Sequence, residues 1–159
     1  NAAKFRNRDQ LLKTCRDSVQ NGYWPEGMDI TALIVHELGH QLETVIMQKR
    51  AGLTDAYYIT EENEDAFSSY IEDGLSRNQT TSKALIEQAE EIWKDTYGHT
   101  GTDEEFRTSI SGYAEGTQQD GGISYTETVA EAITDIYLNG DQAADASKSL
   151  GEAIQNNLK

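Results

Sequence analysis

The segment His36-Glu37-Leu38-Gly39-His40 combines two imidazoles and a carboxylate within five positions. On an α-helix, side chains four positions apart lie on one face, so His36 and His40 are close enough to ligate one metal ion. Glu37, between them, is then placed to accept a proton from a metal-activated water. This spacing is typical of zinc hydrolases, in which the metal acidifies water and the glutamate acts as general base. The segment therefore predicts the centre of a catalytic site.

A catalytic zinc needs a further protein ligand beyond two histidines and keeps one position for water. The chain has one cysteine, Cys15, and its remaining histidine is His99, so an oxygen ligand is favoured. The segment 126–138 carries three carboxylates at intervals of four, which a helix would stack on one face: Glu127, Glu131 and Asp135. Stacked like charges repel one another, and a nearby cation relieves that repulsion. The sequence thus predicts that this acidic segment meets the histidine helix at the metal.

Simpler interpretations of the same residues stay open. The two histidines would also suit a helical core, and the three carboxylates would also suit a solvated acidic face. Glu43, three positions after His40, is expected at the surface or in support of a ligand. His99 is most simply a loop residue. A weaker source of the third ligand is the downstream acidic group Glu61, Glu62 and Glu64.

Three motifs together resemble a known family. The histidine segment, then Ser111-Gly112-Tyr113-Ala114, then the stretch from Glu127 through Glu131 to Ala132, is similar to the gluzincin metallopeptidases of the anthrax lethal factor type. Related domains occur in secreted bacterial peptidases and in phage head or minor capsid proteins. The resemblance covers residues 31–50 and 111–138.

The resemblance implies a role for each matching residue. One Zn²⁺ would be held by His36, His40 and Glu127, with Glu131 supporting a ligand and Tyr113 stabilising the oxyanion. The family's tyrosine usually lies nearer the ligand glutamate than Tyr113 does, so Tyr125 is an alternative for that role.

A second register of the acidic motif stays open. The stretch from Glu131 to Asp135 also resembles the Glu-x-x-x-Asp motif of thermolysin-like enzymes. In that register Glu131 would ligate the metal and Asp135 would orient a histidine. We favour Glu127 as the third ligand.

Charge and composition exclude several partners. The chain has 28 acidic and 13 basic residues and a net charge of −15 at pH 7. Such a surface does not suit nucleic acid, whose phosphates require lysine and arginine, and it does not suit an anionic membrane. No apolar run is long enough to span a bilayer.

The expected fold is mainly α, because proline occurs once, at Pro25, and long stretches lack helix-breaking residues. We predict helices over 3–20, 31–50, 61–75, 82–97, 103–111, 126–138 and 142–158, with 123–125 as a short strand. Apolar residues on all sides of 31–50 predict a central, buried helix. The helix start is expected at Asp29 or Thr31.

Together with the resemblance, these elements predict one compact, zincin-like metallopeptidase domain over residues 1–159, with at most a small β-sheet. Residues 51–110 are expected to form a helical wall or lid. The expected activity is that of a zinc-dependent endopeptidase acting on a protein or peptide. The alternative is a structural or interaction domain of a phage or secreted protein that retains the zinc site without peptidase activity.

The N-terminal residues Asn1-Ala2-Ala3-Lys4 lack both an initiator methionine and the apolar core of a signal peptide. We therefore expect a domain of a larger polypeptide or a processed product. A secreted or virion-associated protein is favoured over a membrane protein.

Overall fold

The chain is mainly α-helical, as predicted. The computed structural model describes residues 8–24, 27–53, 79–116 and 122–159, together with Glu64, Asp65, Ser68, Ser69 and Glu72. Its helices are α1 (Arg8–Gln20), α2 (Ile30–Arg50), α4 (Gln79–Tyr97), α5 (Asp103–Thr108), α6 (Tyr125–Asn139) and α7 (Asp145–Leu158), with a 3₁₀ turn at Gly140–Gln142. In the predicted strand 123–125, Ile123 forms an isolated β-bridge and α6 already begins at Tyr125.

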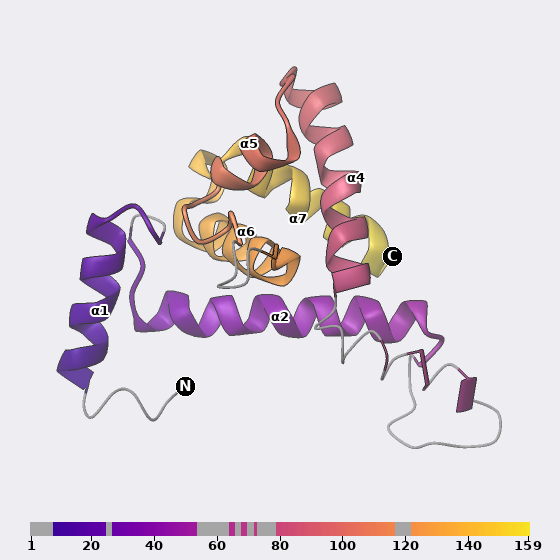
Figure 1. Ribbon diagram of the computed structural model, residues 1–159, viewed down its shortest axis with the longest axis horizontal. Coiled ribbons are helices and arrows are strands. Elements are labelled where there is room, and N and C mark those ends of the chain that lie inside the picture. Colours follow the sequence, from indigo (N-terminus) through magenta and orange to yellow (C-terminus); the bar gives the residue numbers. More distant parts are fainter. Residues whose placement is uncertain are drawn as a thin grey trace.

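Helix α2 runs along one edge of the structure, and α4, α6 and α7 lie on one side of it (Figure 1). Its N-terminus is capped by Asp29, whose carboxylate accepts a hydrogen bond of 2.9 Å from the Ala32 amide. The cap is therefore Asp29 rather than Thr31. Gly52 follows the helix with φ of 75°, a left-handed conformation that favours glycine and ends the helix.

The prediction that α2 is buried on all sides was wrong. Ile34, Leu38 and Val45 are 57%, 53% and 47% exposed. The other face of α2 is buried and consists of Ala32, His36, Gly39, Glu43, Ile46 and Met47. An amphipathic helix needs only one face in contact with the core, and here the covered face carries His36 and Glu43, while His40 is partly exposed.

The covered face of α2 packs against α6, and α6 packs in turn against α7 and α4. The core between these helices is built from large apolar side chains with almost no exposed surface, among them Ile46, Leu85, Ile86, Trp93, Phe106, Val129, Leu150 and Ile154. Burial of each such side chain stabilises the fold by about 1.5–3 kcal/mol relative to leaving it exposed. The core therefore fixes α6 against α2, which is the interface that brings the candidate ligands together.

Part of the predicted wall over 51–110 is described. Helix α4 packs against α7 and α6, while the predicted helix over 61–75 falls outside the described residues except at five positions, from Glu64 to Glu72. Within the described parts of the chain, no helix is both long and apolar enough to cross a lipid bilayer.

Helix α5 fixes the segment that follows it. The Thr102 side chain and the Glu105 side chain form a reciprocal capping box at the start of α5. Arg107, which is 3% exposed, pairs with Asp103 at 2.8 Å and donates a hydrogen bond to the Glu115 carbonyl. This buried guanidinium therefore ties the segment 109–116, which carries Tyr113, to α5.

Candidate metal centre

Helices α2 and α6 approach each other closely at Gly39. A methyl group built on Gly39 would lie 2.8 Å from the Ala130 Cα, a distance that no real side chain tolerates. Because Gly39 has no side chain, the two helix backbones can come close. The side chains of His36 and His40 are thereby brought nearer to α6. His36 lies one turn before this contact and His40 directly after it, both facing α6.

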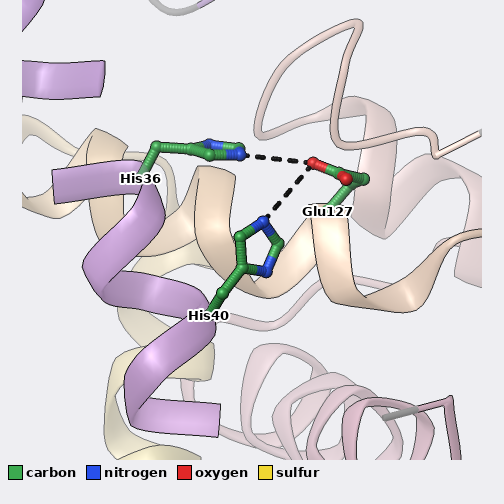
Figure 2. Close-up of side chains that lie close together, drawn as sticks. All are labelled: His36, His40 and Glu127. Carbon is green, nitrogen blue, oxygen red and sulfur yellow. Dashed lines mark ion pairs between the residues drawn. The ribbon is translucent and has the colours of Figure 1, made fainter. Parts of the chain in front are cut away.

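Three ligand atoms converge at this interface (Figure 2). Glu127 Oε2 lies 3.2 Å from His36 Nε2 and 3.8 Å from His40 Nε2. One ligand atom from each of His36, His40 and Glu127 lies within 4.8 Å of the others, and no other such group occurs among the described residues. Ligands held about 2.0–2.2 Å from a tetrahedral zinc lie roughly 3.4 Å apart, so this spacing suits one such ion.

The second nitrogen of His36 faces Glu131 of α6. His36 Nδ1 lies 2.9 Å from Glu131 Oε1, and the Ser111 hydroxyl donates a 2.8 Å hydrogen bond to Glu131 Oε2. Ser111 in turn accepts a 3.0 Å hydrogen bond from the Ala114 amide. Glu131, which is fully buried, therefore fixes the His36 ring and also anchors the segment that precedes Tyr113.

The charges around His36 and Glu127 favour a positive charge between α2 and α6. Burial alone would lower the pKa of His36, but its contacts with Glu127 and Glu131 outweigh burial and raise that pKa to about 9. Burial raises the pKa of Glu127, and the nearby His36 and His40 outweigh it and hold that pKa below its ordinary value. In the metal-free site a proton on His36 thus neutralises Glu127.

A divalent cation suits the same interface between α2 and α6. Glu127 Oε2, the atom that faces Nε2 of both histidines, is buried and receives no well-directed hydrogen bond from the protein. Leaving a buried polar atom without a partner costs about 1–3 kcal/mol. Two imidazole nitrogens and a carboxylate oxygen are also a donor set typical of catalytic zinc. The described residues therefore fit a zinc ion in number, chemistry and spacing.

Tyr113 lies beside the three convergent side chains. Its ring centroid is 6.0 Å from that of His36, and its hydroxyl interacts with Glu127. Burial, together with the neighbouring carboxylates, raises the pKa of Tyr113, so the hydroxyl stays protonated and can donate a hydrogen bond. The Tyr113 amide donates a 2.9 Å hydrogen bond to the Tyr23 carbonyl, and the Gly112 amide donates a 3.2 Å hydrogen bond to the Gly22 carbonyl. These two bonds join the Tyr113 segment to the turn that follows α1.

Tyr125, the alternative tyrosine, has a different environment. Its ring packs against the hydrophobic core, and the Arg107 guanidinium lies 6.0 Å from the ring centroid. Of the two tyrosines considered from the sequence, Tyr113 is the one whose contacts with His36 and Glu127 are observed.

Asp135 is engaged at the other end of α6. Its carboxylate accepts hydrogen bonds of 2.9 Å from the Ala144 amide, 2.5 Å from Ser147 and 2.7 Å from Asn139. These contacts tie α6 to the start of α7. The three carboxylates that were predicted to share one helix face therefore have different partners. Glu127 and Glu131 contact His36, while Asp135 binds the start of α7.

The other candidates are not among the three convergent ligands. Glu37 is exposed on α2, next to His36 in sequence. His99 pairs with Asp145 at 3.1 Å and stacks on Trp93, with ring centroids 4.4 Å apart. Glu64 is exposed, whereas Glu61 and Glu62 lie outside the described residues.

Sequence reasoning underestimated Glu43. It is 1% exposed, its carboxylate accepts a hydrogen bond from Ser82, and Oε2 lies 3.9 Å from His40 Nδ1. Its position three residues after His40 was the available signal. What the sequence did not reveal is that Ser82 of α4 covers this side chain and removes it from solvent.

No protein-family model, no curated protein and no solved structure matches this chain.

Proposed function

We propose that this chain is a zinc-dependent endopeptidase domain of the gluzincin type, with His36, His40 and Glu127 holding one Zn²⁺. The observation that carries the proposal is the convergence of the two Nε2 atoms and one carboxylate oxygen at the interface of α2 and α6. These atoms come from residues far apart in sequence, and the motif that contains both histidines is the one that zinc hydrolases use.

A zinc ion bound there would supply Lewis acidity, lowering the pKa of water toward about 7 and polarising a carbonyl group. Glu37, exposed beside His36, is the residue in this motif that accepts the proton from the attacking water and passes it to the leaving amine. Tyr113, kept protonated by its burial, donates a hydrogen bond to the oxyanion that develops on the peptide carbonyl.

The supporting residues have separate tasks in this scheme. Glu131 Oε1 lies 2.9 Å from Nδ1 of His36 and so directs Nε2 toward the metal. Ser111 links Glu131 to the Tyr113 segment, so the same buried carboxylate aligns both a ligand and the oxyanion donor. This connection supports the register in which Glu127 ligates the metal and Glu131 orients a histidine.

The proposed substrate is a protein or peptide, and the proposed setting is a larger secreted or phage-associated protein. A net charge of −15 gives no means of binding a phosphate backbone. A bound cation would locally offset part of this negative charge at the site.

The decisive experiment compares wild type with Glu37→Gln in a zinc assay and in a peptide-library cleavage assay. We expect one zinc per chain in both proteins and cleavage by wild type alone, because Glu37 is not a ligand. Asp9→Asn, a change at an exposed carboxylate of α1, is the matched control and should cleave like wild type.

Two results would contradict the proposal. Wild type that binds no zinc lacks the metal centre altogether. Zinc-loaded wild type that cleaves no peptide, but melts at a higher temperature than the metal-free protein, would instead be a structural or interaction domain. Adding simple esters and amides to the screen identifies a hydrolase that acts on other bonds.

A further inference from the structure

We infer that Glu43 is a positioning residue of the proposed metal centre, holding the His40 ring with its proton on Nδ1 and presenting Nε2 toward Glu127. The inference rests on the proposed function, since it concerns one of the same ligands. It adds a residue that the lethal-factor-like motifs do not contain and connects the centre to helix α4.

The burial of Glu43 requires an explanation. Its side chain is 1% exposed, and moving a carboxylate out of water costs several kcal/mol unless donors surround it. The Ser82 hydroxyl of α4 donates to Oε1, so one oxygen has a neutral donor. A carboxylate in this position is costly for packing alone, where an apolar side chain would serve better.

The other oxygen of Glu43 faces His40. Oε2 lies 3.9 Å from His40 Nδ1, and the opposite ring nitrogen, Nε2, lies 3.8 Å from Glu127. An imidazole whose Nδ1 faces an acceptor keeps its proton there and leaves the Nε2 lone pair for a metal.

His36 shows the same arrangement. Its Nδ1 lies 2.9 Å from Glu131 and its Nε2 lies 3.2 Å from Glu127. Both histidines therefore have a fully buried carboxylate at Nδ1 and share Glu127 at Nε2. One supporting carboxylate comes from α6 and the other from α2 itself, where α4 holds it through Ser82.

The test uses the full chain with zinc alone as the probe. Zinc affinity is measured by competition with a chromophoric chelator in wild type, Glu43→Gln, Ser82→Ala and Asp145→Asn. The nitrogen chemical shifts of His40, measured on the metal-free proteins, report which ring nitrogen carries the proton. Asp145→Asn is the matched control, because it removes a carboxylate from a histidine outside the site, His99.

We expect Glu43→Gln to bind zinc about 10- to 100-fold more weakly, the usual effect of losing such a partner. Its His40 should show a mixture of tautomers, where wild type shows the proton on Nδ1. Ser82→Ala should lose less affinity, because the carboxylate remains but is less firmly held. Asp145→Asn should bind zinc like wild type.

The inference is overturned if Glu43→Gln keeps both the wild-type zinc affinity and the wild-type His40 tautomer. If Glu43→Gln does not fold, Ser82→Ala decides, and wild-type values in both measurements overturn the inference. Wild type that binds no zinc overturns the proposed function instead. The tautomer measurement needs no metal, so the two failures are distinguishable.

Discussion

Gly39 of α2 lies directly against Ala130 of α6, so close that a methyl group on Gly39 would be 2.8 Å from the Ala130 Cα. This contact occurs inside the histidine segment, between His36 and His40. The position is therefore a packing constraint, and it sets how near the imidazoles come to Glu127.

Gly39→Ala should destabilise the fold by about 1–3 kcal/mol, the usual cost of overpacking, and should weaken zinc binding as the helices separate. Thermal melting and chelator competition measure the two effects. Gly151→Ala on α7 is the control, since its methyl would meet only the flexible end of Ile136. A Gly39→Ala protein with wild-type stability and affinity would contradict this interpretation of the interface.

Glu127→Ala and Glu131→Gln distinguish the two ligand registers. We expect Glu127→Ala to lose stoichiometric zinc, because it removes the oxygen that faces both Nε2 atoms. Glu131→Gln should keep one zinc with an affinity about 10- to 100-fold lower. Zinc content and competition titration provide the measurements. Loss of zinc only in the Glu131 variant would instead favour the thermolysin-like register.

Tyr113→Phe should reduce kcat for peptide cleavage by about 10²- to 10³-fold, because one donor to the oxyanion is lost. Zinc affinity should change little. Steady-state kinetics on a cleaved peptide provide the measurement. Tyr125→Phe serves as the control, and a larger loss in that variant would transfer the role to Tyr125.

The stability of the metal-free protein should fall as pH rises from about 6.5 to about 9. The pKa of His36 is raised from 6.5 to about 9 on folding, so the folded state holds this proton more tightly. That contribution is fully present below the unfolded pKa and is lost as pH rises through the folded one. Melting temperature against pH measures it, and His36→Gln should remove this part of the dependence.

Zinc binding should depend on pH in the opposite direction, since the metal must displace the His36 proton. Below about pH 9 the apparent affinity should rise by roughly tenfold per pH unit for each proton released. Chelator competition between pH 6 and pH 9 tests this. A flat profile would show that zinc, if bound, is not held by His36.

Much of this arrangement could be predicted from local sequence. Helix periodicity and cap residues predicted α2, α4 and α6 within a few positions of their bounds. The spacing of His36 and His40 placed both imidazoles on one face, because that relationship depends only on helix geometry. The division between Glu127 and Glu131 could not be decided locally, since both share a face and only the packing of α6 on α2 selects one.

The errors have a common physical origin in contacts between distant segments. Ile34, Leu38 and Val45 looked like core residues, but α4, α6 and α7 lie on the opposite side of α2. For Glu43 the sequence left two places open, the surface or the support of a ligand, and the contact with Ser82 of α4 shows that the side chain is buried. Neither fact follows from the pattern within α2.

The amides of Gly112 and Tyr113 donate hydrogen bonds to the carbonyls of Gly22 and Tyr23, so the segment that follows α1 holds Tyr113, the proposed oxyanion donor, in place. A truncated protein beginning at α2 would keep every proposed ligand but would lose the two carbonyl groups that hold the Tyr113 segment. Any minimal version of this domain therefore has to include α1 and the turn that follows it.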